Sequence, residues 1–396
     1  MITDKQKIKE ILDRGIIADI LPSRKEFEKE LLAGKKLKIY LGVDPTAPDL
    51  HLGHSQNYLL LEDFRRLGHK IIILIGDFTA CIGDPSDRSS ARQQLSTEEV
   101  KTNAKYWLKL IKPLLNFDDK KNPPEVVFNR KWLSKLNFEQ VIELAANFTV
   151  QQMIERDMFA KRLKNNEPIY MHEFFYPLMQ GYDSVQLEVD AELCGTDQTF
   201  NALAGRTLLK RYKNKDKFVI TTHLVANPKT GELMSKSKGT GIFLSWPAEK
   251  MYGAIMATPD EMTEVFLIRC TRLPLDKIKK ILKKNPLEAK MITAQEIVSI
   301  YHGPQKAEEA KKYFRQTFQE KKLPTDLPEL SLKKNKSLPE ILVDNSIISS
   351  KNDWRRLIKE GAIKLNGEEK ITAENFRPNE TCVLKIGKKR FVRIKI

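Results

Sequence analysis

The pattern of apolar and polar residues predicts a strand, a loop and a helix early in the chain. The strand forms the first half of the stretch 38–67, where Tyr40, Gly42 and Asp44 alternate with apolar residues and therefore share one face. Two prolines follow and force a loop. A helix then begins at Leu52, and its apolar residues recur at intervals of one helical turn.

A second strand follows this helix. Gly68 ends the helix, and residues 71–75 form a continuous apolar run, which is typical of a strand buried on both faces of a parallel sheet. Strand, helix and strand in this order form a βαβ unit, whose crossover we expect to be right-handed. Because ligands of such sheets bind beyond the carboxyl ends of the strands, we expect a binding site at that edge.

The remaining elements are predicted from the same patterns. One or two helices lead the chain over residues 1–37, and a helical insertion occupies about 130–170. The other elements of the first half are a helix at 97–112 and strands at 125–133, 189–193 and 218–225.

The second half of the chain has a different pattern of predicted elements. Residues 245–322 read as helices, and a stretch rich in proline and lysine reads as a linker. The last part should contain two short helices, at about 339–344 and 350–360, and strands joined by turns at 366–367 and 387–389. The fold class is therefore α/β with a parallel sheet, followed by a helical domain and a small α+β domain.

Two histidines at the start of the predicted helix are the first candidate site. His51 and His54 lie three residues apart, on one side of a helix N-terminus, where unpaired N–H groups and the helix dipole favour an anion. Gly53 between them would let a flat ring approach the backbone. Capping or surface histidines are the alternative interpretation. A zinc site is disfavoured, because no cysteine pair or third ligand lies nearby.

Further polar residues follow the predicted strands at the ligand edge. Asp84 comes just after Gly83 and is a candidate to bind an amine, although it could equally cap a turn. Asp197 could bind ribose hydroxyls, and Gln198 an amide or carboxylate group. Tyr176, Gln180 and Asp183 share one helix face, which could also be a solvated edge.

A small, basic loop is predicted at residues 235–241. Lys236 and Lys238 stand among serines and glycines, so we expect a mobile loop whose cations reach phosphates. No Gly-x-Gly-x-x-Gly follows the first strand, and no phosphate-loop motif of the type Gly-x-x-x-x-Gly-Lys-Ser is present. The sequence therefore disfavours a dinucleotide enzyme.

These motifs together resemble those of a known family. Tyr40-x-Gly42-x-Asp44-Pro-Thr-Ala, followed by His51-Leu-Gly-His54, is similar to the signature of tyrosyl-tRNA synthetases, which are class I aminoacyl-tRNA synthetases. The loop at Lys236 resembles the KMSKS motif of that class, although Leu233 stands where the family often has lysine, which leaves the role of Lys238 open. The resemblance covers nearly the whole chain.

The resemblance implies a Rossmann-like catalytic domain over 1–242, an anticodon-stem domain over 243–322, a linker over 323–336 and an RNA-binding domain over 337–396. It implies that tyrosine and ATP, used with magnesium but without a tightly bound protein metal, react to form tyrosyl-adenylate, from which tyrosine passes to tRNA(Tyr). His51, His54 and Lys236 would be catalytic. The ATP-binding residues would be these three with Gly53, Gly195, Asp197, Leu224 and Val225.

The tyrosine-binding residues are implied in the same way. Tyr40 and Asp183 would bond the phenol, and phenylalanine would leave both unpaired. Tyrosyl-tRNA synthetases are themselves the standard example of such discrimination, at roughly 10⁵-fold without editing. The ammonium would be held by Asp84, Tyr176 and Gln180, with Asp44 and Gln198 orienting the substrate. Tryptophanyl-tRNA synthetase is the related alternative, but indole needs no such pair of hydroxyl partners.

Composition and charge agree with a polyanionic partner. The 396 residues include 68 Lys and Arg against 52 Asp and Glu, a formal charge of +16, although a solvated basic surface is the alternative. Residues 331–396 hold 16 of these basic residues against 8 acidic ones. This stretch resembles the small RNA-binding fold named after ribosomal protein S-four, with Arg355, Arg356, Lys359 and Lys364 as candidate RNA contacts.

Cysteine usage and apolar runs indicate the compartment. Four widely spaced cysteines form no Cys-x-x-Cys and favour a reducing compartment, so we expect a cytoplasmic protein. The charged, helical start is unlike a signal peptide, and the run 71–75 is too short to cross a membrane. The family resemblance further implies a homodimer formed through residues 130–170.

Two other functions remain as alternatives at this point. A different nucleotidyltransferase could use the histidines to activate a small molecule, but it would not need a helical domain and a basic RNA module. An RNA-binding protein with a relic catalytic lobe is the second alternative. Intact His51, His54, Asp183 and Lys236 argue against it.

Overall fold

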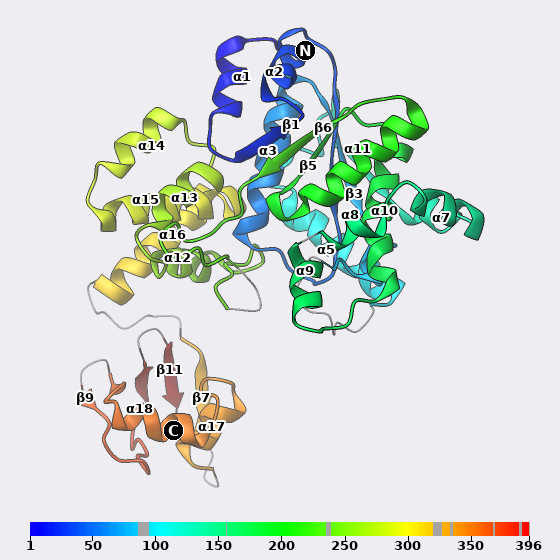
Figure 1. Cartoon of the computed structure of the whole chain (residues 1–396). Helices are drawn as coiled ribbons and strands as arrows, with labels where there is room; N and C mark the ends of the chain where they lie inside the picture. Colours follow the sequence, from blue (N-terminus) through cyan, green and yellow to red (C-terminus); the bar gives the residue numbers. More distant parts are fainter. Residues whose placement is uncertain are drawn as a thin grey trace. The chain divides into compact units, whose positions relative to one another are not determined.

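The computed structural model divides the chain into two compact units, Met1–Pro304 and Gln305–Ile396 (Figure 1). It describes residues 1–85, 95–155, 157–234, 239–319, 327–332, 336–366, 369–387 and 390–395. Within these ranges, no helix combines the length and the apolar character that crossing a membrane requires.

A six-stranded sheet with the order β1-β6-β5-β2-β3-β4 is the core of the first unit. Its strands are β1 (Ile17–Leu21), β2 (Lys38–Val43), β3 (Lys70–Ile75), β4 (Glu125–Phe128), β5 (Ala191–Gly195) and β6 (Phe218–Thr222). All pairs are parallel except β1 with β6. The predicted α/β class with a parallel sheet is confirmed.

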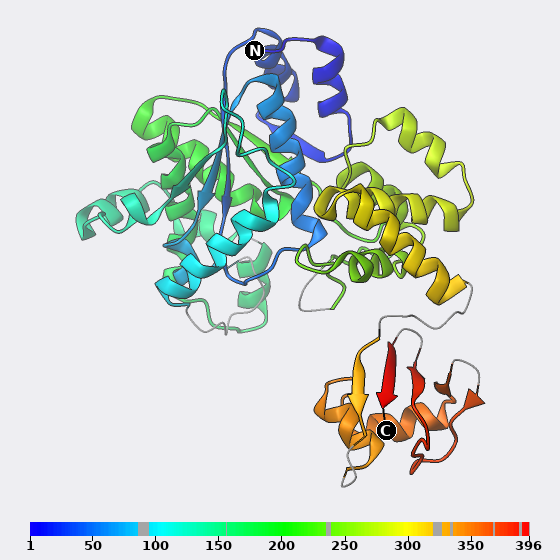
Figure 2. The same cartoon turned by 180° about the vertical axis from the view of Figure 1, so that it is seen from behind.

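Helices cover both faces of this sheet. Figure 1 shows α10 (Met171–Leu187) and α11 (Thr199–Lys213) in front of the strands, and Figure 2 shows α3 (Leu52–Leu67) and α5 (Thr97–Ile111) on the opposite face. The short helices of this part are α4 (Thr79–Ile82), α6 (Arg130–Leu133), α7 (Phe138–Ala145), α8 (Val150–Ile154) and α9 (Asp157–Lys164).

The β2–α3–β3 unit forms as the sequence predicts. Every residue of β3 after Lys70 is buried, as a central parallel strand requires. The stripe of α3 faces the core, and Gly68 ends the helix in the left-handed conformation, with φ of 105°. The carboxyl ends of β2 and β3 consequently lie side by side, with the N-terminus of α3 close to them.

Two element predictions for the first unit were wrong. Residues 1–37 contain α1 (Lys5–Leu12) and α2 (Arg24–Leu32), but also strand β1, because the apolar residues at 16, 17 and 20 are buried against the free edge of β6. The strand predicted at 125–133 ends at Phe128. Asn129 turns the chain there, since its N–H bonds the carbonyl of Ile75, and α6 follows.

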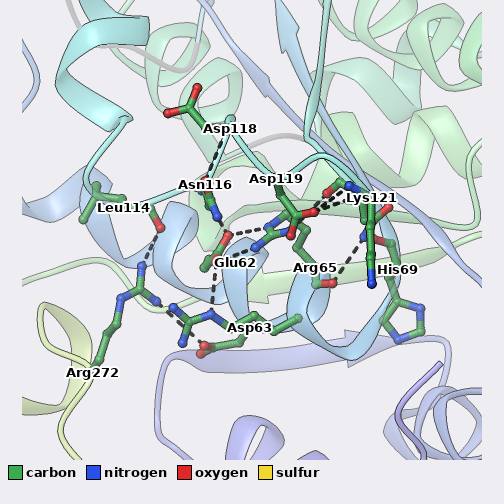
Figure 3. A network of polar contacts seen from close by, with 12 residues as sticks. Glu62, Asp63, Arg65, His69, Leu114, Asn116, Asp118, Asp119, Lys121 and Arg272 are labelled. Carbon is green, nitrogen blue, oxygen red and sulfur yellow. Dashed lines mark hydrogen bonds and ion pairs between the residues drawn. The ribbon is translucent and has the colours of Figure 1, made fainter.

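Four helices at 248–302 pack within the first unit: α12 (Ala248–Met256), α13 (Met262–Arg269), α14 (Leu275–Leu282) and α15 (Pro286–His302). Arg14 stabilises the end of α13, because its guanidinium donates hydrogen bonds to the carbonyls of Ile268, Thr271 and Leu273 at 2.7–2.9 Å. Figure 3 shows a second attachment, where Arg272 donates to the carbonyl of Leu114 at 2.5 Å.

The same close-up shows how the C-terminal half of α3 is fixed. Arg65 is nearly buried and pairs with Glu62 at 2.7 Å and with Asp119 at 2.7 Å (Figure 3). Glu62 lies on α3, and Asp119 lies in the loop after α5. The network therefore connects this loop to the helix whose other end carries the histidines.

The second unit has a mixed sheet with the order β7-β11-β10-β8-β9 and its own apolar core around Trp354. Its elements are α16 (Pro304–Phe314), which starts at the boundary, a π-helical turn (Arg315–Gln319), β7 (Glu329–Ser331), α17 (Leu338–Asp344), α18 (Lys351–Lys359), β8 (Ile363–Leu365), β9 (Glu369–Lys370), β10 (Cys382–Ile386) and β11 (Arg390–Lys395). Strand β7 lies inside the stretch predicted as a linker and pairs in parallel with β11. Gly367, Lys388 and Lys389 of the predicted turns lie outside the described residues.

Candidate active site

A cavity of about 1900 Å³ opens at the carboxyl ends of β2, β3 and β5. It is the site that the sheet topology predicts. The predicted residues that line it are Asp44, His51, Gly53, His54, Asp84, Tyr176, Gln180, Asp183, Gly195, Asp197, Gln198, Leu224 and Val225. Tyr40 is fully buried and does not line the cavity. Lys236 and Lys238 lie outside the described residues.

The two histidines form a reciprocal cap at the N-terminus of α3. Nδ1 of His51 accepts the N–H of Gly53 at 3.1 Å, and Nδ1 of His54 accepts the N–H of His51 at 3.1 Å. The ring centroids are 3.9 Å apart. Because Nδ1 is an acceptor in each neutral ring, the proton is on Nε2, and each histidine has one N–H left to donate.

Burial keeps these rings neutral. It lowers the pKa of His51 to about 3, with a further contribution from the neighbouring His54. Burial also lowers the pKa of His54 to about 4. Both histidines are therefore uncharged donors at physiological pH. The capping interpretation and the anion-binding interpretation are both compatible with this geometry, because capping uses Nδ1 and leaves Nε2.

Position 53 requires glycine because it lies against the ring of His51, a contact that the sequence did not reveal. A Cβ there would lie 2.8 Å from Cε1 of the His51 ring and 2.9 Å from its Nδ1. Any side chain would therefore displace His51 from its cap. Gly195 is constrained in a similar way, since a Cβ would lie 2.3 Å from the Asp197 carboxylate.

Asp44 is held in the cavity wall by two hydroxyl groups. Its Oδ1 accepts from Thr79 at 2.7 Å, and its Oδ2 accepts from Tyr176 at 2.9 Å. Burial raises the pKa of Asp44 to about 7, although both hydrogen bonds act in the opposite direction. This carboxyl is consequently poised to change its charge near neutral pH.

Asp183 is held by two donors. Its Oδ1 accepts from the indole of Trp132 at 2.7 Å, and its Oδ2 accepts from the amide of Asn129 at 3.2 Å. Burial raises the pKa of Asp183 well above its usual value. The hydroxyl of Tyr40 instead bonds Ser184 Oγ at 2.9 Å, and no hydrogen bond joins it to Asp183.

The other predicted residues form two linked groups. The amide of Gln198 donates to Asp84 at 2.7 Å, and its oxygen accepts from Asn201 at 2.8 Å. Leu224 and Val225 begin the segment that leads to the basic loop, and the N–H of Met234 returns to the carbonyl of Val225 at 2.9 Å. The base of that loop is therefore fixed to the cavity wall.

Several polar residues of the site escaped prediction. Asn129 follows the carboxyl end of β4, so the rule that found Asp84 applied to it as well. Glu192 and Lys217 are charged residues in or beside apolar strands, which is a signal of a buried ion pair. Trp132 left no signal, because its helix was predicted as a strand.

The predicted RNA contacts lie in the second unit. Arg355 pairs with Glu374 at 3.1 Å, and Arg356 pairs with Asp353 at 2.7 Å and with Glu360 at 2.8 Å. For Lys359 and Lys364, the described residues supply no ion pair. The two arginines therefore share their charge with acidic neighbours on an exposed helix face.

Comparison with known proteins assigns both units. Residues 32–319 match the family tRNA synthetases class I (W and Y), and residues 319–394 match the tyrosine--tRNA ligase SYY-like C-terminal domain. The tyrosine--tRNA ligase of Moorella thermoacetica is 42% identical over 97% of this chain and 94% of its own length. That of Haemophilus influenzae is 37% identical over 100% of this chain and 98% of its own.

Solved structures agree on the fold. A C-terminally truncated mitochondrial tyrosyl-tRNA synthetase of Aspergillus nidulans has a TM-score of 0.67 and 24% identity, over 79% of this chain and 94% of that one. The tyrosyl-tRNA synthetase of Archaeoglobus fulgidus, solved with L-tyrosine, has a TM-score of 0.59 and 19% identity, over 77% of this chain and 99% of that one. The chain therefore belongs to the tyrosyl-tRNA synthetase family, the class I ligases that activate tyrosine with ATP and attach it to tRNA.

Proposed function

We propose that His51 and His54 bind the phosphates of ATP through their Nε2–H groups and stabilise the transition state of tyrosine activation. The observation that carries this proposal is the neutral, reciprocally capped histidine pair at the N-terminus of α3, beside the carboxyl end of β2. Donors held in place before the reaction act on developing charge without reorganisation. Lys236 would hold the leaving pyrophosphate from the loop whose base is fixed at Val225.

The rest of the ATP site follows from the cavity wall. Gly195 and Asp197 lie at the end of β5, where Asp197 would bind the ribose, and Leu224 and Val225 would contact the adenine. Magnesium would enter with ATP, bound mainly to the phosphates, as is usual for this ion. Among the described residues, no cluster of three or more metal-binding side chains offers a separate metal site.

Tyrosine would occupy the other side of the cavity. Asp84, Tyr176 and Gln180 would hold its ammonium, while Asp44 and Gln198 would orient it. Asp183 would bond the phenol, and the participation of Tyr40 stays a prediction because its hydroxyl is bonded to Ser184. The relative from Archaeoglobus fulgidus, whose structure contains L-tyrosine, supports a tyrosine site on this fold.

The reaction needs no protein nucleophile. The tyrosine carboxylate attacks the α-phosphate in line, and pyrophosphate leaves. Binding both reactants in one cavity supplies proximity, and the histidine donors supply charge stabilisation. The tyrosyl group then passes to a hydroxyl of the terminal ribose of the tRNA.

Tyrosine binding should weaken below pH 7. The ammonium of tyrosine favours an ionised Asp44, whose pKa is about 7, so protonation at lower pH opposes binding. In magnesium-dependent exchange of pyrophosphate into ATP, KM for tyrosine should rise about tenfold from pH 8 to pH 6. KM for ATP should stay constant, since both histidines remain neutral. Asp44→Asn should remove the pH dependence, and a persisting one would contradict this assignment.

We further propose that residues 243–322 contact the anticodon stem of tRNA(Tyr) and that the C-terminal domain, 337–396, binds RNA through Arg355, Arg356, Lys359 and Lys364. A chain that ends at residue 319, where the two family matches meet, should exchange pyrophosphate within about twofold of the full chain. Its kcat/KM for tRNA should fall about tenfold or more, because phosphate contacts are lost. Unchanged charging of tRNA would contradict the RNA-binding role of the C-terminal domain.

A second copy of the chain is the proposed partner of the inserted helices. Large apolar side chains are exposed there, which is typical of an interaction surface. They are Phe138, Ile142, Val150 and Leu163. The double variant Phe138→Glu/Ile142→Glu should sediment as a monomer, whereas Leu287→Glu, at an exposed leucine of α15, should sediment as a dimer. A native chain that sediments as a monomer would contradict the proposal.

The cytoplasm is the proposed compartment. The four cysteines are free in the structure, which fits reducing conditions, and the similar ligases come from bacteria. Cell fractionation with antibody detection tests this assignment.

A further inference from the structure

A buried ion pair lies beneath the tyrosine end of the cavity. Glu192 is on β5, and Lys217 directly precedes β6; their side chains are 2% and 0% exposed and in direct contact. Tyr40 is the neighbour of Glu192 in the register of β2 and β5, so the two side chains share a face of the sheet. Helices α10 and α11 cover this face (Figure 1).

Each member of the pair contacts a residue next to the substrate cavity. Oε1 of Glu192 accepts the amide N–H of Gln180 at 2.9 Å. Nζ of Lys217 donates to Ser184 Oγ at 2.7 Å, and Ser184 in turn bonds the hydroxyl of Tyr40 at 2.9 Å. Gln180 and Ser184 are one turn apart on α10, so the pair fixes two successive turns of the helix that carries Asp183.

The packing leaves a space that fits this lysine. A Cβ on Gly205 of α11 would lie 2.6 Å from Nζ of Lys217 and 2.7 Å from Ser184 Oγ. Gly181 of α10 has the same relation to α11, since its Cβ would lie 3.2 Å from the backbone nitrogen of Gly205. The two helices therefore approach each other closely at Gly181 and Gly205. Any larger residue at position 205 would displace the ammonium group of Lys217.

Stability alone does not explain such a pair. Desolvation of two charges offsets much of their attraction, and apolar residues of equal volume often serve a core as well or better. A specific consequence of the pair is the orientation of Gln180. A carboxylate only accepts hydrogen bonds, so Glu192 binds the NH₂ of the Gln180 amide. The oxygen of that amide is then the group left for another partner. An amide oxygen is what an ammonium ion requires.

We propose that Glu192 and Lys217 are positioning residues for tyrosine binding, which fix the amide of Gln180 so that its oxygen faces the substrate ammonium. This inference rests on the proposed role of Gln180. Lys217 holds the Glu192 carboxylate in place through their direct contact, and its hydrogen bond to Ser184 joins the phenol end of the site to the ammonium end.

The test is Glu192→Gln, which keeps the volume but presents either an acceptor or a donor to Gln180. KM for tyrosine in pyrophosphate exchange should rise about tenfold, with KM for ATP within twofold of native. Inhibition by tyramine, which has the ammonium, should weaken by the same factor. Inhibition by 3-(4-hydroxyphenyl)propanoate, which lacks it, should stay constant. Asp216→Asn, at the exposed ion pair with Lys210, is the control and should change none of these values.

Equal weakening of both inhibitors by Glu192→Gln would show a merely structural role and overturn the inference. If Glu192→Gln proves unstable, Glu192→Gln/Lys217→Met removes both charges and leaves neither unpaired, and it should show the same selective loss. Gln180→Ala separates the two levels of the argument. If Gln180→Ala weakens inhibition by tyramine and Glu192→Gln does not, the positioning role of Glu192 and Lys217 is wrong while the role of Gln180 stands. If Gln180→Ala leaves inhibition by tyramine unchanged, the proposed role of Gln180 is wrong, and the positioning role fails with it.

Discussion

The His54→Asn variant should form tyrosyl-adenylate ~10²- to 10³-fold more slowly than the native chain, whereas His54→Gln should lose less than about tenfold. The difference follows from the two ring nitrogens. Nδ1 of His54 accepts the N–H of His51 at 3.1 Å, a contact that the oxygen of asparagine can replace. Asparagine has no atom at the position of Nε2, while the longer glutamine side chain brings an N–H there.

The measurement is a single-turnover reaction of saturating enzyme with tyrosine and ATP, quenched on the millisecond scale. Thermal unfolding serves as the control, because both variants should melt close to the native chain if the cap of α3 is intact. Equally slow reactions of both variants would show that the donor at Nε2 is not what the reaction uses. The histidines would then be capping residues.

The parts of this site that the sequence predicts are those in which a local motif determines the geometry. His51 and His54 are three residues apart at a helix start, so their contact needs no information from the rest of the chain. Gly195 ends a buried strand, Asp84 and Gln198 follow such strands, and the common edge of a parallel sheet brings the three together. The edge strand β1 was missed because its pairing with β6 is a long-range contact that leaves no periodic signal.

The environment of each side chain was less predictable than its position. Tyr40 shares its strand face with Asp44, but it precedes Asp44 by four residues and is covered by Ser184 on α10. Asp183 depends on Trp132 and Asn129, which lie more than fifty residues earlier and belong to elements that the sequence pattern assigned to one strand. Which hydroxyl or amide meets a buried carboxylate is decided by helix packing, and spacing in the sequence does not reveal it.

Removal of the Asp183 carboxyl should abolish most of the preference for tyrosine. For Asp183→Ala, kcat/KM for tyrosine should fall ~10³-fold while kcat/KM for phenylalanine changes little, because only tyrosine has a hydroxyl to lose its partner. Such a loss equals about 4 kcal/mol of transition-state binding. Pyrophosphate exchange with each amino acid measures both values, and Trp132→Phe, which removes one donor to Asp183, should show a smaller change in the same direction.

Tyr40→Phe is the matched comparison, since it removes a hydroxyl from the same end of the site. That hydroxyl bonds Ser184 and does not line the cavity, so its loss should reduce kcat/KM for tyrosine less than about tenfold. A loss as large as that of Asp183→Ala would mean that Tyr40 leaves Ser184 and bonds the phenol when tyrosine binds. The ratio of the two variants therefore decides whether one side chain or two recognise the hydroxyl that separates tyrosine from phenylalanine.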